Sequence, residues 1–201
     1  MQLKFSPFSP YVRKVMVLAH ELGLDARIEK QPVAQSPYEP AADVGRLNPL
    51  GKVPVLVTDD GVALFDSTVA CEYLSHLAGD EQWFPPPGIT RWEALRCNAV
   101  AGGLLEAAQL CRMEAARPAG MRYAKWSDAQ MRKVVQALDF LEVHLPTQED
   151  IGAISVACAL GWQDLRWPDL GWRDGRPALQ AWFGQFAGRA SFACTAPPGQ
   201  T

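Results

Sequence analysis

The fold of this chain is decided between residues 48 and 56, where the sequence reads Asn48-Pro49-Leu50-Gly51-Lys52-Val53-Pro54-Val55-Leu56. The first part carries Asn, Pro and Gly, which are turn residues, and the second part is a β-branched run that contains a proline. Proline cannot donate to a sheet ladder, so Pro54 marks an edge strand, a bend or a cis peptide bond. A cis bond would leave the N–H and C=O of Val53 to pair with an extended peptide, whereas an ordinary edge-strand proline would not.

Strand and helix patterns alternate on both sides of this stretch. Ser9-Pro10 begins an apolar helical repeat that ends at Gly23, and Asp59-Asp60-Gly61 is a hairpin turn signal. The patterns predict strands over residues 1–5, 26–29, 53–57 and 62–65, and helices over residues 10–22 and 66–77, with a short helical segment before Asn48. This order predicts a mixed sheet with helices on both faces.

The second half of the chain reads differently. Residues 79–88 contain a stiff Pro run and form the best linker candidate. After them no strand is predicted, and helical patterns cover residues 89–116, 128–145, 151–162 and 177–188. We therefore expect two domains, an α/β domain over residues 1–78 and an all-helical domain over residues 89–201.

Composition narrows the functional classes. The chain has 201 residues, 48% of them hydrophobic, and a formal net charge of −3. It has no long basic run, which argues against nucleic-acid binding, and no apolar stretch of about 18 residues, which argues against a membrane span. The N-terminus reads as a strand and not as a signal peptide, so we expect a cytoplasmic protein.

The five cysteines are odd in number and widely spaced. This pattern argues against a disulfide framework and a metal site, and it predicts small buried side chains. The three histidines are scattered over separate predicted helices, and none is interpreted as a metal ligand or a general base.

Two predicted helix starts have both a structural and a functional interpretation. Ser9 precedes Pro10, and Asp66-Ser67 begins the helix that follows the hairpin. Either start is explained by helix capping alone. A helix N-terminus is also a natural site for an anion, so Ser67 could bind a carboxylate and Ser9 could donate a hydrogen bond to a thiolate, while Asp66 could pair with a ligand ammonium.

Taken together and in this order, the segments Ser6–Lys14, Asn48–Leu56 and Leu64–Ser67 resemble the N-terminal domain of cytosolic, and in particular bacterial, glutathione transferases. Residues 103–114, 154–162 and 176–192 resemble the C-terminal domain of the same family. The resemblance implies a thioredoxin-like α/β domain that binds glutathione, followed by an all-α helical bundle.

The resemblance also assigns roles to residues of the first domain. Pro54 would be cis, and the backbone of Val53 would bind the cysteinyl part of glutathione. Asp66 and Ser67 would hold the γ-glutamyl amine and carboxylate, and Lys52 would approach the glycyl carboxylate.

The remaining implied roles concern catalysis and the second substrate. Ser9 occupies the position of the catalytic Ser or Cys of related classes. The electrophile pocket would lie along the long helix at Glu106, Gln109, Leu110 and Met113. Glutathione would be a co-substrate without a metal, and the family leads us to expect a homodimer.

The activity expected from the resemblance is conjugation of the glutathione thiolate to a hydrophobic electrophile. One alternative is a non-catalytic glutathione-binding, ligand-binding or protein-interaction module of the same fold, because fold alone does not determine function. The other is a glutathione-dependent reductase or peroxidase, which is disfavoured because Ser9 replaces the reactive Cys. The predicted core helix also departs from the family, since Asp150 and Ala153 leave half of its capping box missing.

Overall fold

The computed structural model describes residues 1–34 and 41–199, and the Pro-rich stretch from Pro32 to Pro40 therefore lies mostly outside the described residues. The chain divides by its contacts into two compact units. One, here called the sheet unit, consists of Met1–Arg91 and the C-terminal segment from Gly188. The other, here called the helical unit, consists of Trp92–Ala187.

The sheet unit is built on four strands in the order β2-β1-β3-β4. These strands are β1 (Gln2–Phe5), β2 (Glu29–Pro32), β3 (Val55–Val57) and β4 (Ala63–Leu64). β1 pairs with β2 in parallel and with β3 antiparallel, and β3 pairs with β4 antiparallel. Leu3 and Leu56 face each other in the register and are fully buried, so the core begins at the centre of the sheet.

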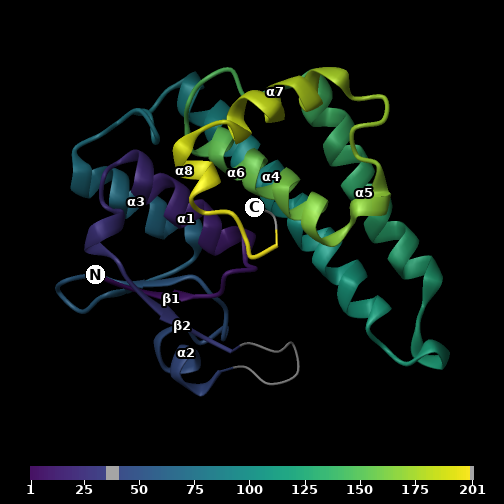
Figure 1. The fold of residues 1–201 in the computed structure, drawn as a ribbon, viewed down its shortest axis with the longest axis horizontal. Coiled ribbons are helices and arrows are strands. Elements are labelled where there is room, and N and C mark those ends of the chain that lie inside the picture. The colour runs from purple at the N-terminus through teal and green to yellow at the C-terminus, as the bar shows by residue number, and fades with distance from the viewer. Residues whose placement is uncertain (35–40, 200–201) are drawn as a thin grey trace. The chain divides into compact units, whose positions relative to one another are not determined.

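The helices of this unit that lie within its N-terminal segment are α1 (Pro10–Glu21), α2 (Ala42–Leu47) and α3 (Ser67–Ala78). α1 and α3 pack against each other, and Figure 1 shows them over one face of the sheet with α2 on the other side. α1 begins at the Ser9 cap and is followed by Gly23 at a φ of 65°, as the sequence predicts. The expected mixed four-stranded sheet with helices on both faces is thus confirmed.

The second strand differs from the prediction over residues 26–29. Residues Asp25–Arg27 form a 3₁₀ turn, in which the N–H of Ile28 bonds the carbonyl of Asp25 at 3.1 Å. Ile28, whose apolar side chain suggested a strand, is buried in the core and lies before the strand begins. β2 begins only at Glu29, which pairs with Gln2.

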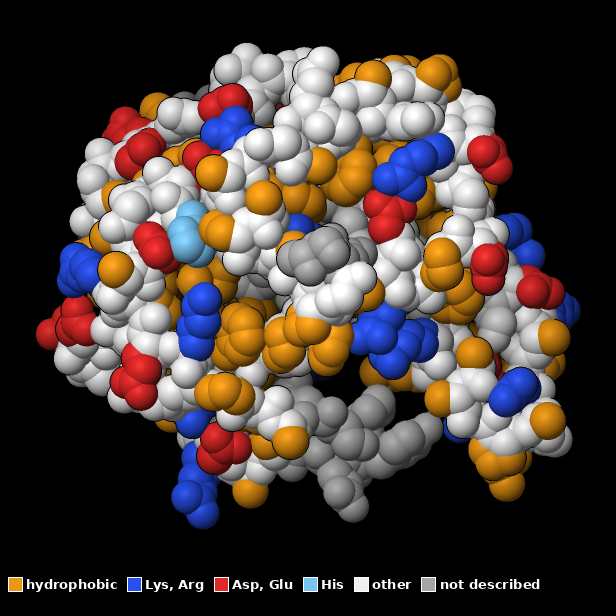
Figure 2. All heavy atoms as spheres, viewed as in Figure 1, with side chains coloured by type: hydrophobic (Ala, Val, Ile, Leu, Met, Phe, Trp, Pro, Cys, Tyr) orange, Lys and Arg blue, Asp and Glu red, His pale blue; other side chains and the backbone are white. Residues whose placement is uncertain are grey.

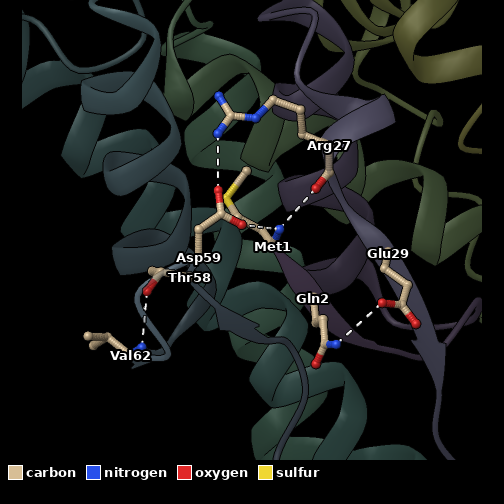
Figure 3. A network of polar contacts seen from close by, with 7 residues as sticks. All are labelled: Met1, Gln2, Arg27, Glu29, Thr58, Asp59 and Val62. Carbon is tan, nitrogen blue, oxygen red and sulfur yellow. Dashed lines mark hydrogen bonds and ion pairs between the residues drawn. The ribbon is translucent and has the colours of Figure 1, made fainter.

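A polar network joins β1, the 3₁₀ turn and the β3–β4 hairpin (Figure 3). The backbone nitrogen of Met1 donates to Asp59 Oδ1 at 2.6 Å, and Arg27 contacts the other carboxylate oxygen of Asp59 at 3.1 Å. Within the hairpin, the N–H of Val62 donates to the hydroxyl of Thr58 at 3.0 Å. These contacts fix the end of the sheet at which β1 starts.

The C-terminal segment packs on α1. Arg189 forms a two-point ion pair with Glu21, with N–O distances of 2.7 and 2.9 Å, just before α8 (Ala190–Ala193). The buried guanidinium of Arg13 lies 3.6 Å from the ring centroid of Phe192 and donates to its carbonyl at 2.8 Å. Both contacts bring residues from the two ends of the sequence into the same unit.

The helical unit contains α4 (Ile89–Ala115), α5 (Ala124–Val143), α6 (Ile151–Arg166) and α7 (Pro177–Ala187), with α4 starting in the preceding unit. Residues 151–163 of α6 are all buried, so this helix forms the core of the unit. Within the described residues of the unit no strand occurs, which confirms the predicted helical C-terminal region.

At the start of α6, only the N-cap half of a capping box is present. Asp150 is buried and its carboxylate accepts the N–H of Ala153 at 3.1 Å. Burial raises the pKa of this carboxyl, and the hydrogen bonds to the backbone partly oppose the change. The acid therefore serves as the cap alone, without the partner that a capping box would supply.

On the face drawn in Figure 2, acidic and basic side chains are interspersed. Neither sign of charge dominates this face, as expected for a chain whose formal net charge is only −3. Among the described helices, none combines the length and the apolar character needed to cross a membrane.

Candidate functional site

The strand register brings three of the predicted segments to one end of the sheet. Lys4 faces Val55 in the antiparallel β1–β3 pair, so the residues before β3 lie beside those that follow β1. Leu64 faces Leu56 in the β3–β4 pair, so the residues after β4 lie beside those before β3. Val53-Pro54, the Ser9 turn and Asp66-Ser67 therefore converge, although they are far apart in sequence.

The turn before β3 is braced by Asn48, which is 2% exposed. Its side-chain oxygen accepts the N–H of Leu50 at 3.0 Å, and its amide nitrogen donates to the carbonyl of Lys52 at 2.8 Å. Gly51 adopts a φ of 62°, which a residue without a side chain allows. Sequence reasoning treated Asn48 only as a turn residue, although Asn is known to bond the backbone two residues on.

The Val53–Pro54 peptide bond is cis, as is Phe65–Asp66. Pro54 is buried and Val53 is half-buried, while the side chain of Lys52 is exposed. Val53 precedes β3, and neither its N–H nor its C=O forms a hydrogen bond with any residue among those described. Its backbone is thus available at the end of the sheet for an extended peptide.

The N-terminus of α3 is formed by Asp66, Ser67 and Thr68. Asp66 is the N-cap: its Oδ1 accepts the N–H of Thr68 at 2.8 Å, and its side chain is exposed. Ser67 is the first helical residue and only 1% exposed. The predicted capping role of Asp66 is thus present, and the helix start leaves backbone N–H groups and positive dipole potential for an anion.

A lysine that sequence reasoning did not single out lies at this helix start. Lys14 on α1 is buried, and its Nζ donates to Thr68 Oγ1 at 3.2 Å. The contact ties α1 to α3 next to Ser67. The position of Lys14 within an apolar helical repeat was the available signal, because a cation there must find a polar partner.

Ser9 is half-buried at the N-cap of α1, with its backbone in the extended region. Its hydroxyl accepts the N–H of Val12 at 3.3 Å, and its carbonyl accepts that of Arg13 at 3.0 Å. The structural interpretation of Ser9 as a cap is therefore correct.

This end of the sheet has the groups that a short anionic peptide needs. It offers a backbone at Val53 that is not paired with any described residue, a helix N-terminus at Ser67, a carboxylate at Asp66 and a hydroxyl at Ser9. Peptide groups pair with free strand backbone, and carboxylates bind at helix N-termini.

Four of the five cysteines are buried, and the fifth is exposed. Cys71, Cys97, Cys111 and Cys158 are buried, as predicted, and burial raises the pKa of the Cys97 and Cys111 thiols. Cys194 departs from the prediction: it is exposed, because it follows the last turn of α8 at the surface. Within the described residues, no cluster of His, Cys, Asp or Glu is suited to holding a metal ion.

The predicted electrophile-pocket residues belong to the helical unit. Glu106 and Met113 are exposed, and Gln109 and Leu110 are half-buried. Their spacing places them on one side of α4.

Comparisons with known proteins identify the family to which the chain belongs. Residues 8–77 match the model of the glutathione S-transferase N-terminal domain, and residues 124–185 match that of the C-terminal domain. The chain is also 32% identical to the uncharacterized GST-like protein YibF of Escherichia coli (strain K12), over 98% of this chain and 99% of that protein. The chain belongs to the glutathione S-transferase family.

Solved structures agree with this assignment. A glutathione transferase family member from Pseudomonas fluorescens Pf-5, with bound glutathione, is 42% identical with a TM-score of 0.95, over 98% of each chain. A second structure of a glutathione transferase family member from Pseudomonas fluorescens Pf-5 has S-(propanoic acid)-glutathione bound. It is 41% identical with a TM-score of 0.89, over 98% of this chain and 100% of that one. A glutathione S-transferase from Methylobacillus flagellatus with glutathione bound is 34% identical, with a TM-score of 0.87, over 98% of each chain.

Proposed function

We propose that this protein is a glutathione transferase that joins the glutathione thiolate to an electrophile. The observation that carries the proposal is the convergence of Ser9, Val53 and Asp66-Ser67 at one end of the sheet. Glutathione bound in relatives that are 42% and 34% identical supports the same ligand for this chain.

In the proposed complex, the cysteinyl N–H and C=O of glutathione pair with the backbone of Val53 beside the cis Pro54. The γ-glutamyl carboxylate accepts hydrogen bonds from Ser67 and the N-terminal N–H groups of α3, and its ammonium pairs with Asp66. The exposed ammonium of Lys52 approaches the glycyl carboxylate.

The chemistry proposed for Ser9 is activation of the thiol. A thiol with a pKa of about 8.5 is only a few per cent thiolate at neutral pH, and lowering that pKa by about two units requires about 2.7 kcal/mol. A charge-assisted hydrogen bond from the Ser9 hydroxyl contributes about 1.5–3 kcal/mol, and the α1 dipole adds about 0.3–1 kcal/mol. The thiol proton leaves to solvent, and no general base is needed.

The thiolate then attacks the electrophile: a carbon–sulfur bond forms and the leaving group departs with its electron pair. The electrophile lies against the side of α4 that carries Glu106, Gln109, Leu110 and Met113. S-(propanoic acid)-glutathione in a relative that is 41% identical is a conjugate of this kind. We propose a cytoplasmic homodimer, as in the family expectation.

Turnover tests this proposal against a reductase and against a module that only binds. The purified protein should conjugate glutathione to at least one activated aryl chloride faster than the uncatalysed reaction, and Ser67→Ala should lower the rate at subsaturating glutathione. Reduction of a glutathione mixed disulfide without conjugation would favour the reductase. Binding of glutathione without turnover on a panel of electrophiles would favour the non-catalytic module.

A further inference from the structure

Asn48 forms more hydrogen bonds than the turn that it begins requires. That turn is already closed by the N–H of Gly51, which donates to the carbonyl of Asn48 at 2.9 Å. The side chain of Asn48 adds two bonds, one from the N–H of Leu50 at 3.0 Å and one to the carbonyl of Lys52 at 2.8 Å. The second of these bonds reaches beyond the turn, to the peptide unit that joins Lys52 to Val53.

Asn48 is itself held in place by the core of the sheet unit. It is buried, and its backbone N–H donates to the carbonyl of Val44 in α2 at 2.8 Å. Val44 is fully buried, so the backbone of Asn48 is anchored to a residue of the core. Because its side-chain oxygen and nitrogen both have partners, the amide of Asn48 is fixed in one orientation.

The bond to Lys52 sets the direction of the N–H of Val53. A peptide unit is planar, and in its trans form the carbonyl and the N–H point to opposite sides. The Lys52–Val53 unit is trans, because cis peptide bonds in the described residues occur only before Pro54 and Asp66. Since its carbonyl points to the buried amide of Asn48, its N–H points away from Asn48. That N–H forms no hydrogen bond with any residue among those described.

Stabilisation of the turn explains only part of this arrangement. Asn at the start of a turn commonly binds the backbone N–H two residues on, and this accounts for the bond from Leu50. It does not call for the bond to Lys52, four residues on, since the N–H of Gly51 already closes the turn. The effect of the additional bond is to fix the peptide unit that carries the N–H of Val53.

We propose that Asn48 is a positioning residue for glutathione: it orients the N–H of Val53 toward the cysteinyl carbonyl before the ligand binds. A donor that is already fixed in its bound direction does not have to be ordered on binding. The fixed N–H also makes the site selective, because it favours a thiol peptide whose cysteinyl residue offers a carbonyl oxygen. This inference rests on the proposed function, in which the cysteinyl part of glutathione pairs with Val53.

A matched pair of ligands tests the inference: S-methylglutathione, and its thioamide analogue in which sulfur replaces the cysteinyl carbonyl oxygen. Both lack a free thiol and carry the same charges, but sulfur is the weaker hydrogen-bond acceptor. In calorimetric titration, the wild-type protein should prefer S-methylglutathione by about five- to tenfold. Asn48→Asp retains an acceptor for the N–H of Leu50, but its carboxylate cannot donate to Lys52. It should reduce the preference to about twofold or less by weakening the binding of S-methylglutathione alone.

Two further variants separate orientation of the N–H from stability of the fold. Asn48→Ala loses both side-chain bonds without placing a charge in a buried position, and it should lose the preference as well. Thr58→Val is the matched control, because Thr58 is a buried residue that braces the turn at the opposite end of β3 from Val53. Its hydroxyl accepts the N–H of Val62 at 3.0 Å (Figure 3). Thr58→Val should lower the melting temperature and keep the preference of the wild type.

The possible results distinguish this inference from the proposed function. Equal weakening of both ligands in the Asn48 variants, or a preference that these variants retain, would overturn the role of Asn48 and leave the proposed function standing. A wild-type protein that binds both ligands equally well would also overturn that role, while glutathione binding itself would remain. A folded wild-type protein that binds neither ligand would contradict the proposed function and the inference together.

Discussion

The hydroxyl of Ser9 accepts the N–H of Val12 at 3.3 Å. A hydroxyl accepts through its lone pairs and donates through its single proton, so this bond leaves the proton of Ser9 for a thiolate. The capping and catalytic interpretations of Ser9 are therefore compatible, and they are separated by variants that change one role at a time.

Ser9→Ala removes both roles. We expect kcat/KM to fall by about 10- to 100-fold and the pKa of the bound thiol to rise by about one to two units, with glutathione affinity within several-fold of wild type. Loss of the cap should also cost about 1 kcal/mol of stability. The pH dependence of thiolate absorbance in the complex measures the pKa.

Ser9→Gly is the matched control, because glycine preserves most of the capping energy but has no hydroxyl. It should be nearly as stable as wild type and as slow as Ser9→Ala. Ser9→Thr retains both roles. Full activity in Ser9→Gly would show that the hydroxyl is only a cap.

Asp66 combines a cap and a charge in the same way. Asn caps helices about as well as Asp, so Asp66→Asn should leave the melting temperature nearly unchanged. Glutathione affinity should fall by about tenfold, because the ammonium of the γ-glutamyl group loses its partner. Ser67→Ala should likewise weaken binding in the titration, and wild-type affinity in both variants would remove the γ-glutamyl assignment.

Glu21 holds the C-terminal segment through Arg189 and Ser191. The hydrogen bond from Arg189 is the main cause that lowers the pKa of Glu21 below its ordinary value of 4.5. The stabilisation is therefore complete above that value and is lost as the pH falls through the lower, folded-state pKa. Glu21→Gln should cost about 1–2 kcal/mol at pH 7 in denaturant unfolding, and the difference from wild type should shrink in acid.

Glu72→Gln is the control for Glu21. Glu72 is half exposed and pairs with Arg91 at 2.6 Å, so its loss should change stability by no more than about 1 kcal/mol. A Glu21 variant no less stable than this control would contradict the role given to Glu21.

Replacing a helical glycine by alanine should have opposite effects on the stability of the protein at two positions. A Cβ at Gly152 would lie 2.6 Å from the carbonyl oxygen of Ala94 and 2.7 Å from Cys97 Cβ, so Gly152→Ala should cost about 1–3 kcal/mol or more. At Gly103 on α4 the Cβ meets no described atom within 4 Å, and Gly103→Ala should stabilise by about 0.5–1 kcal/mol. Thermal unfolding of the two variants measures both signs, and tolerance at Gly152 would refute the tight packing of α6 on α4.

The sheet could be predicted from sequence because its signals are local. The turn at Asn48 and Gly51, the proline at 54 and the cap at Ser9 each act over a few residues, and the structure bears them out. The position of β2 could not be predicted, because a 3₁₀ turn and a strand compete for the same apolar Ile28.

Contacts between residues that are far apart in the sequence could not be predicted from local patterns. Arg13 reads as one half of a basic pair on a helix, yet it is 7% exposed and bonds Phe192, 179 positions away. Likewise, only the structure shows that Gln163 is fully buried and that its side-chain amide has no hydrogen-bond partner among the described residues.

Calorimetric titration of the purified protein with glutathione, and with S-methylglutathione in parallel, tests the central claim most directly. The account predicts that both bind in the micromolar to millimolar range, about −8 to −4 kcal/mol, because the peptide site does not depend on the free thiol. A folded sample that binds neither ligand would contradict the account.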